Sequence, residues 1–454
     1  MAIPILVSDI SMLGVFSIKR SVSYKIGLAG AVEIIVGTVV GSGIYIMIGP
    51  LAVAAGPGLF LCYLIALVIA VTSSVCYAQV ASVFPSTAAT YQYAKMFYND
   101  YIGFVTGWFR LIGSFCGLAL MSSGFAHYIS AYLAVDRKLI AVAVLTVILV
   151  VNLLGIKTTQ RVVQFLVVAV IAGLAIFCGF GVFEIKPGNL TPLWGPGIGP
   201  VLKGSMSAFY AYTGLYIVAE VGDEVENPQK NIPKSIFIAS VIVGLLYLFT
   251  TFVFSGGLGW DTIKEYEPNL AQAARLLINP WAAALIQISA MVAIITPMNA
   301  AYMASSRSLY SLAVDRIMPL VFSKLNRYNV PGFATVTIYI FALLMIVLDL
   351  PVLFLGTISS IVILSGMTLV AGACLVIKKK YPESFESAPF KLSDASLKAL
   401  PIFTIISAVL LTVASLVEDP LMLYSFGFWF LLGSGYYYIR KNILSRRGQL
   451  RQKG

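Results

Sequence analysis

Charged side chains are scarce in this sequence. Of its 454 residues, only 11% are Asp, Glu, Lys or Arg and 59% are hydrophobic. A typical soluble globular protein is about 25% charged. With a mean hydropathy of +0.93, the chain has too few polar residues to cover its apolar ones in water. The composition therefore excludes an ordinary soluble domain and indicates a protein whose surface faces lipid.

Groups that could perform chemistry are equally scarce. His127 is the only histidine, and the apolar runs contain neither an HExxH motif nor a pair of acidic residues. A metal site needs several ligands, and an enzyme site needs a nucleophile with a base. We therefore expect no metal, no cofactor and no catalytic residues. The five cysteines lie in apolar runs without CxxC spacing, so we expect them to fill space as small apolar side chains.

What the sequence has instead is long runs without charge. A membrane-spanning helix needs roughly 20 apolar residues, because the hydrocarbon layer is about 30 Å thick and each residue rises about 1.5 Å. The charge-free runs are 34–94, 111–135, 139–156, 162–183, 204–219, 235–260, 276–306, 328–348, 351–377, 399–417 and 421–439. A Gly-Pro-Gly turn at residues 56–58 divides the first run in two. The sequence thus predicts an all-α membrane protein of about twelve spans.

The positive charges predict the orientation. If the N-terminus is cytoplasmic and twelve spans alternate, the cytoplasmic segments hold 23 of the 30 Lys and Arg residues and the outer loops hold 6. Cytoplasmic loops of membrane proteins carry such an excess. We expect both termini in the cytoplasm and a multi-pass protein of the plasma membrane. The N-terminus shows no cleavable signal pattern, so the first long span is expected to act as the insertion signal. The net charge of +11 is then an orientation signal and does not indicate nucleic-acid binding.

The first span contains three glycines, Gly37, Gly41 and Gly43, within seven residues. Each weakens a helix by about 1 kcal/mol relative to alanine. An unwound stretch inside a membrane is tolerated only where it lines a cavity or is buried in protein. The half-helix after such a break would offer free N–H groups to a carboxylate, and the half-helix before it would offer free carbonyls to an ammonium. The same glycines also fit a packing seam against a neighbouring helix.

The sixth span, with a small residue in the middle of residues 209–216, is similarly interrupted. Interrupted helices at matching places in two halves of a chain indicate a transporter site between the halves.

Four blocks of residues resemble a known family: residues 41–45 (GSGIY), 84–93 with 104–108, 226–233 (ENPQKNIP) and 306–313. On these blocks the chain resembles the amino acid–polyamine–organocation (APC) superfamily, in particular its amino-acid permease branch, over about residues 25–440.

The resemblance implies a five-plus-five inverted-repeat (LeuT-like) core with helices 1 and 6 broken, followed by helices 11 and 12. It divides the chain into a cytoplasmic N-terminal segment (1–25), a first repeat (26–184), a second repeat (200–377), a cytoplasmic loop (378–398), helices 11 and 12 (399–440) and a basic cytoplasmic tail (441–454).

The resemblance also implies a set of substrate-binding residues. The N–H groups of Ser42, Gly43 and Ile44 would hold an α-carboxylate, and the carbonyls of Val39, Tyr210 and Thr213 would hold an α-ammonium. Tyr210 would in addition be the gate that closes over the substrate. The expected site as a whole comprises Val39, Gly41, Ser42, Gly43, Ile44, Tyr210, Ala211, Thr213, Gly214 and Tyr216.

The sequence departs from its family in ways that bear on coupling and partners. Some relatives place a lysine in span 5, near Val168, as a substitute for a sodium ion, and this span has none. Tyr216 stands where carriers of dications have a carboxylate. The loop between spans 3 and 4 has no cysteine, so we expect no disulfide-linked accessory subunit.

Two charges lie within the predicted spans. Arg110 lies about nine residues into span 3, and Glu33 precedes Gly41 by eight residues. Charges at membrane depth are functional hypotheses by default. Arg110 could act in the transport cycle or extend its side chain to the cytoplasmic surface, and the role of Glu33 is equally open. Taken together, the sequence predicts secondary-active transport of small-molecule amino acids, neutral and apolar L-amino acids in particular, by exchange or proton coupling. A polyamine or other organic-cation carrier of the same fold is the alternative.

Overall fold

A computed structural model describes residues 25–86, 89–130, 133–155, 160–195, 197–220, 222 and 225–451. The expected N-terminal segment therefore lies outside the described residues, except for Lys25, as do residues 87 and 88 of the second family block. Within the described ranges the chain folds into helices and has no β-strand beyond an isolated bridge between Ile26 and Val225.

The first half of the chain begins with two short consecutive helices, α1 (Leu28–Val39) and α2 (Ser42–Ala55). A 3-10 turn at Gly56–Gly58 then leads into α3 (Leu59–Val83), where the Gly-Pro-Gly sequence predicts a turn. The remaining helices of this half are α4 (Ala89–Phe97), α5 (Asp100–Ile129), α6 (Arg137–Leu153) and α7 (Gln160–Gly181).

The second half begins, after two 3-10 turns (Val182–Glu184 and Pro187–Leu190), with α8 (Ile198–Phe209), the 3-10 turn η5 (Tyr210–Tyr212) and α9 (Ile217–Glu220). It continues through α10 (Pro228–Leu258), α11 (Trp260–Tyr266), α12 (Leu270–Leu277), α13 (Pro280–Val314), a 3-10 turn (Leu320–Ser323), α14 (Gly332–Val347) and α15 (Val352–Lys380). The helices α16 (Pro382–Ser387), α17 (Asp394–Glu418) and α18 (Pro420–Arg451) complete the chain.

Seven helical segments of the described chain are long and apolar enough to cross a membrane. They are Leu28–Val83, Asp100–Ile129, Phe165–Glu184, Pro228–Leu258, Pro280–Val314, Val352–Lys380 and Asp394–Val417. Large apolar side chains are in the open: Phe165, Leu245 and Ile406 of these segments, and Phe428 of α18, are between 61% and 73% exposed. Apolar surface on this scale needs lipid or a partner to cover it. The chain is thus a multi-pass membrane protein.

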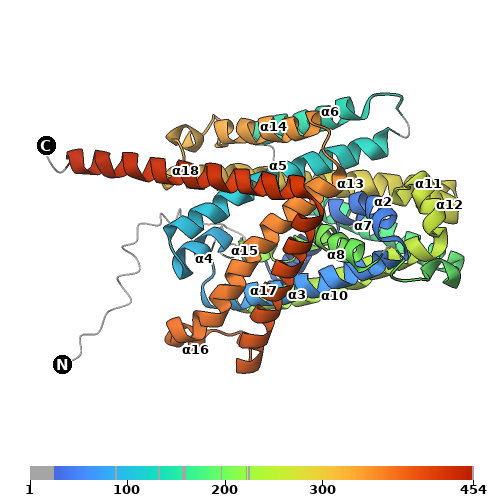
Figure 1. The fold of residues 1–454 in the computed structure, drawn as a ribbon, viewed down its shortest axis with the longest axis horizontal. Helices are drawn as coiled ribbons and strands as arrows, with labels where there is room; N and C mark the ends of the chain where they lie inside the picture. Colours follow the sequence, from blue (N-terminus) through green and yellow to red (C-terminus); the bar gives the residue numbers. More distant parts are fainter. Residues whose placement is uncertain are drawn as a thin grey trace.

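The helices pack around the broken ones. α3 lies against α10 and α8, α5 lies against α13 and α15, and α1 lies against α10. Figure 1 shows α4 and the C-terminal end of α18 at the end of the molecule opposite α11 and α12. The five cysteines are all buried and unpaired, as expected for apolar filler.

Two helix boundaries differ from those expected for the C-terminal part. α17 begins at Asp394, five residues before the expected start at 399, because the Ser393 hydroxyl caps it by accepting a hydrogen bond from the N–H of Ser396. α18 continues past the expected end at 440 to Arg451. No glycine or proline occurs between Gly435 and Gly448, so nothing in that stretch breaks the helix.

Candidate functional site

The first helix is interrupted where the glycines predict a break. α1 ends at Val39, and Val40 and Gly41 are non-helical before α2 begins at Ser42. The sixth span is interrupted as well: α8 gives way to η5 at Tyr210, and turn conformation continues to Tyr216 before α9. Both interruptions lie within the packed interior, since Val40, Gly41, Tyr210 and Ala211 are all buried.

The start of α2 is buried and has no cap. Gly41, its N-cap residue, offers no side-chain hydrogen bond, and the structure records no acceptor among the described residues for the N–H groups of Ser42, Gly43 and Ile44. By contrast, Asn99, Asp136 and Asn269 cap α5, α6 and α12 with side-chain oxygens. A buried helix end without such partners is exceptional. Three N–H groups and the positive end of the helix dipole are therefore available to an anion.

Glycines bring the two interruptions into contact. A Cβ atom on Gly43 would lie 2.3 Å from the Cα atom of Ala211, and one on Gly214 would lie 2.7 Å from Val39 Cγ2. On the other side of the break, a Cβ atom on Gly41 would lie 2.9 Å from Pro297 Cγ in α13. The backbones of the two broken segments thus approach more closely than any side chain would permit. The groups around them are small or apolar.

Tyr210 lies beside this contact with an unused hydroxyl. The residue is 6% exposed, and its hydroxyl has no hydrogen-bond partner among the described residues. A Cβ atom on Gly117 of α5 would lie 3.6 Å from that hydroxyl, and the same position is 3.8 Å from Ser359 Oγ of α15. A buried, unsatisfied hydroxyl costs about 1–3 kcal/mol. The hydroxyl and the uncapped end of α2 together make this place the candidate site.

Two of the carbonyls expected to hold an ammonium are already engaged. Val39 O accepts hydrogen bonds from the N–H of Gly41 at 2.7 Å and from the hydroxyl of Tyr247 in α10. Tyr210 O accepts from the N–H of Thr213 at 3.3 Å and from its hydroxyl at 2.9 Å. A carbonyl oxygen has two lone pairs. A ligand that uses Val39 or Tyr210 must therefore displace one of these donors.

Neither Tyr247 nor the ring cluster to which it belongs was predicted from the sequence. The rings of Tyr63 in α3, Tyr212 in η5 and Tyr247 in α10 lie 5.3–6.2 Å apart, centroid to centroid. The hydroxyls of Tyr63 and Tyr212 have no partner among the described residues. These tyrosines come from three separate helices and share no motif, so only the packing of the helices reveals the cluster.

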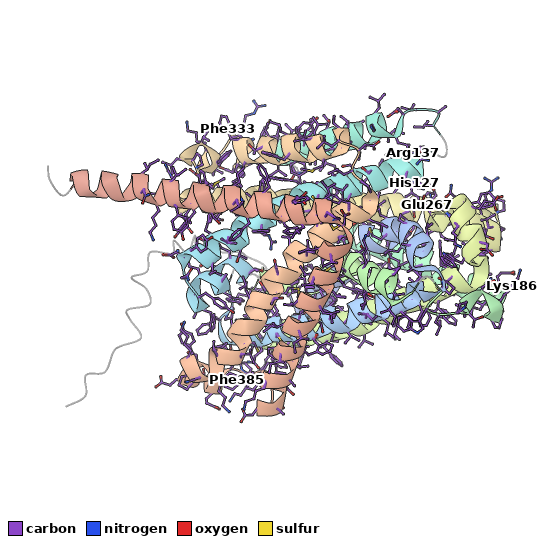
Figure 2. The ribbon with its side chains drawn as sticks, in the orientation of Figure 1. His127, Arg137, Lys186, Glu267, Phe333 and Phe385 are labelled. Carbon is purple, nitrogen blue, oxygen red and sulfur yellow. The ribbon has the colours of Figure 1, made fainter. Side chains whose placement is uncertain are left out.

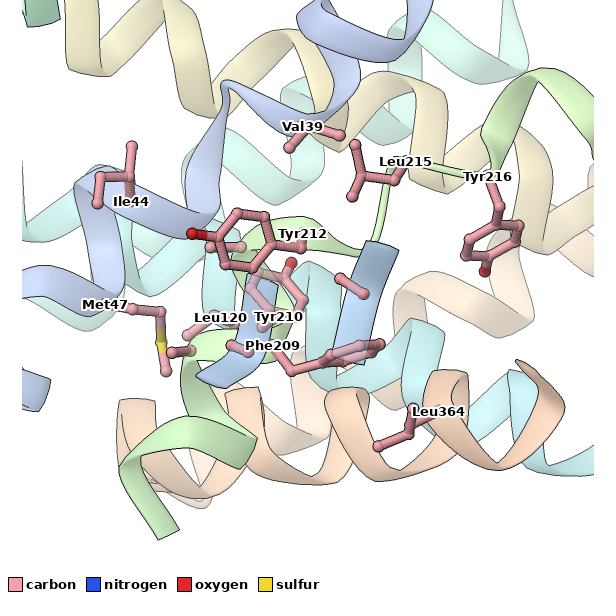
Figure 3. Packing of buried hydrophobic residues seen from close by; sticks show 14 of the residues in the cluster. Val39, Ile44, Met47, Leu120, Phe209, Tyr210, Tyr212, Leu215, Tyr216 and Leu364 are labelled. Carbon is pink, nitrogen blue, oxygen red and sulfur yellow. The ribbon is translucent and has the colours of Figure 1, made fainter. Parts of the chain in front are cut away.

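One expected site residue lies apart from the others. Figure 3 shows Tyr210 and Tyr212 near Val39 and Ile44, with Tyr216 well to the right of them. The Tyr216 ring packs on the Tyr77 ring of α3, 5.0 Å between centroids. The structure therefore brings the expected residues of helix 1 together with Tyr210, Ala211 and Gly214, but places the side chain of Tyr216 in a different aromatic cluster.

The intramembrane charges lie on the α4 side of the break. Arg110, Gly113 and Gly117 follow one face of α5, since a helix returns to the same face after seven residues. Gly117 lies against Tyr210, so Arg110 is on the same stripe about 10 Å further along at 1.5 Å per residue. Glu33 in α1 is exposed. In α7, Val168 is 64% exposed, and it is Val167 that faces Gly37 of α1.

The fold and the site together define a membrane transport protein built around broken helices. Comparison with known proteins refines this class. The sequence profile described as "Amino acid permease" matches residues 26–433. The chain belongs to this family, the amino acid permeases of the APC superfamily. Its substrate is accordingly a small molecule, and its surroundings are a lipid bilayer.

Several curated relatives are similar over most of their length. The methylthioribose transporter of Bacillus subtilis is 25% identical over 429 residues, which are 89% of this chain and 90% of that protein. The branched-chain amino acid permease BcaP of Lactococcus lactis is 26% identical over 437 residues, or 90% and 92% of the two chains. The vacuolar cationic amino acid transporter 4 of Arabidopsis thaliana is 28% identical over 401 residues, 82% of this chain and 66% of that protein.

Proposed function

We propose that this chain carries neutral, apolar L-amino acids across the plasma membrane by alternating access, driven by exchange or by a proton gradient, and that it performs no covalent chemistry. The observation that carries the proposal is the buried, uncapped start of α2 beside the unsatisfied hydroxyl of Tyr210. Every α-amino acid has a carboxylate, and a carboxylate satisfies both features at once.

The N–H groups of Ser42, Gly43 and Ile44 would hold the carboxylate, with Gly41 shaping the turn that exposes them. Hydrogen bonds from N–H groups to a charged acceptor are worth about 1.5–3 kcal/mol each. In this arrangement Tyr210 closes over the bound substrate and donates its hydroxyl hydrogen bond to it.

The ammonium group would bind to the carbonyls of Val39, Tyr210 and Thr213. At Val39 it would replace the hydroxyl of Tyr247, which occupies the carbonyl in the described structure. Tyr247 would thereby hold the end of α1 in place while the site is empty. Ala211 and Gly214 would contribute backbone groups, because a Cβ atom on Gly43 would overlap Ala211 and one on Gly214 would overlap Val39.

The neighbours of the break favour an apolar substrate side chain. The groups closest to Gly41, Gly43 and Gly214 belong to Pro297, Ala293, Ala211, Thr38 and Val39. None of these residues has a charged side chain. The branched-chain substrates named for the Lactococcus lactis relative fit this chemistry. Tyr216, which packs against Tyr77, provides no carboxylate for a dication.

For the whole chain we propose twelve spans and two inverted repeats, residues 26–184 and 200–377. The pairing of helices supports this division. α3 and α10, the second spans of the two halves, pack against each other, and so do α5 and α13, the third spans. Both termini would lie in the cytoplasm. The α4 end, with the C-terminal end of α18, would then be cytoplasmic, and α11 and α12 would lie outside (Figure 1).

Arg110 and Glu33 would lie between the site and the cytoplasm. Arg110 lies on the same face of α5 as Gly117. A substrate that leaves the site towards the cytoplasm would pass this face, so we assign Arg110 to the inner pathway. A proton-coupled cycle would need a titrating group other than a lysine in α7, because neither Val167 nor Val168 can titrate.

The test is uptake of radiolabelled amino acids into liposomes that contain the purified protein. Uptake of leucine, isoleucine or valine only with internal substrate would establish exchange, and uptake driven by an inward proton gradient would establish symport. Methylthioribose and spermidine belong in the same panel. Methylthioribose has no carboxylate, and spermidine has neither a carboxylate nor an apolar end. Uptake of either one, but of no amino acid, would refute the proposal.

A further inference from the structure

A cavity of about 560 Å³ lies at the α11–α12 end of the molecule. We call it the outer pocket. Its walls come from α2, the end of α5, the start of α6, the α11–α12 connection and the segment that joins α14 to α15. Pockets of roughly 300–1,000 Å³ are of the size that holds small molecules. In Figure 2 the labelled residues His127, Arg137 and Glu267 lie near one another at this end.

The outer pocket is distinct from the broken-helix site. It begins at Tyr45 and runs along α2 to Ala54, whereas the proposed carboxylate site is at Ser42–Ile44. Its floor is a network of satisfied hydrogen bonds: the Tyr45 hydroxyl pairs with Ser289 Oγ at 2.7 Å, and the Tyr128 hydroxyl donates to Tyr45 O at 2.9 Å. No residue named for the first site lines this pocket.

Two opposite charges line the pocket without a partner. Lys138 and Asp349, which also line it, form an ion pair of 3.0 Å with each other. Arg137 and Glu267 have no ion pair among the described residues. The pocket thus presents one unpaired cation and one unpaired carboxylate.

A buried amide donor supplies the second polar observation. Asn269 is 5% exposed and lines the pocket. Its Oδ1 accepts a hydrogen bond from the N–H of Gln272 at 2.9 Å, while its Nδ2 has no partner among the described residues. The cap bond fixes which atom of the amide is the oxygen, so the unsatisfied atom is a donor. A buried donor of this kind calls for an acceptor.

Most of the remaining lining is apolar, apart from Ser123 and His127. Ile46 and Val53 of α2 face the pocket together with Ile346, Leu350 and Leu353. The complementary ligand therefore has a carboxylate for Arg137, an ammonium for Glu267, and an aliphatic body between them.

From these features we infer that the outer pocket is a second binding site for a zwitterionic amino acid with an aliphatic side chain. The inference rests on the proposed function only for the choice of ligand. Because α2 forms a wall of this pocket and also presents the N–H groups of the first site, an occupant in the pocket holds the helix that must move for transport. Occupancy of the two sites is coupled through α2, and such coupling is reciprocal.

The experiment is equilibrium dialysis of labelled L-leucine against the purified full-length protein in lipid nanodiscs. We expect two molecules bound per wild-type chain and one in the double variant Arg137→Gln, Glu267→Gln. The matched control is Arg275→Gln, Glu265→Gln, which removes the same two residue types from exposed positions of α12 and α11 outside the pocket. It should still bind two.

The variant Gly43→Leu isolates the outer pocket, because it blocks only the first site. It should retain one leucine per chain and lose it when combined with Arg137→Gln and Glu267→Gln. In this background, 4-methylpentanoate, which lacks the ammonium, and 3-methylbutylamine, which lacks the carboxylate, should each bind at least tenfold more weakly than leucine.

Three results would overturn the inference. One leucine per wild-type chain, lost in Gly43→Leu and kept in the pocket variant, would remove the outer pocket and leave the first site intact. Equal binding of leucine and either analogue would show that the pocket does not distinguish a zwitterion. If the wild type bound no amino acid at all, the proposed function would fail together with this inference.

Discussion

Replacement of Gly43 by alanine is the sharpest test of how the two broken helices form a site. The new Cβ atom would lie 2.3 Å from Ala211 Cα and 2.7 Å from Ala211 Cβ. Carbon atoms in contact normally lie about 3.5–4.0 Å apart. The start of α2 and η5 must therefore separate by roughly 1 Å or more, measured against that contact distance.

The separation can be converted into an expected effect on binding. An N–H···O hydrogen bond of about 2.9 Å ceases to be one when it is stretched by about 1 Å. If one such bond to the substrate carboxylate is lost, about 1.5–3 kcal/mol of binding is lost with it. We therefore expect the KM for uptake to rise at least tenfold. The fold itself should survive, because overpacking costs about 1–3 kcal/mol and the helix preference of alanine returns about 1 kcal/mol.

The assay is leucine uptake into proteoliposomes, with thermal unfolding of the same preparation to show that the variant is folded. Gly179→Ala is the matched control, since a Cβ atom on Gly179 of α7 would meet nothing within 4 Å, and it should transport normally. An unchanged KM in folded Gly43→Ala would refute the close approach of Gly43 and Ala211 as a requirement for the site.

Three further predictions concern single side chains. Tyr210→Ala should reduce uptake more than Tyr212→Ala, and the reverse order would show that the assignment of Tyr210 is wrong. Tyr212→Phe should keep uptake and raise thermal stability by about 1 kcal/mol, because it removes a buried hydroxyl that has no partner among the described residues. Tyr247→Phe should lower the Kd for leucine about fivefold in calorimetry. The ammonium would no longer have to displace the hydrogen bond from the Tyr247 hydroxyl to Val39 O, which is worth about 1 kcal/mol. Weaker binding of leucine by the variant would contradict this role of Tyr247. Lys138→Gln should cost less than about 1 kcal/mol in thermal unfolding, because both partners of its ion pair with Asp349 are largely exposed; a larger loss would mean that the pair has a structural role.

Much of the fold could be predicted from the sequence because lipid imposes simple rules. Backbone groups in hydrocarbon must be paired within the chain, so long charge-free runs predict helices. The break after Val39 was predictable from Gly41 and Gly43. Glycines lower helix preference, and an unwound stretch within a span is tolerated only where it lines a cavity or is buried in protein. Helix ends near water were less predictable, because a single cap such as Ser393 moves them.

The candidate site was predictable only in part. The residues of helix 1 and of η5 could be named from short blocks of sequence. They are proposed to bind substrate through backbone groups, and the close approach of the two backbones requires glycine at positions that the sequence shows. Tyr247 could not be named, since it reaches Val39 from a helix 208 residues further along the chain. The position of Tyr216 was not predictable either, because four residues of turn conformation precede α9 and change the direction of its side chain.

The sequence by itself determined the class of protein and the place of the breaks, since both depend on composition along short segments. Only the tertiary structure decided which backbone groups are free. It leaves three N–H groups of α2 without partners while it occupies the carbonyls of Val39 and Tyr210. It also decided that Arg137, Glu267 and Asn269 line one cavity. Arg137 is more than a hundred positions from the other two, and only the packing of α2, α5 and α6 against the α11–α12 connection brings them together.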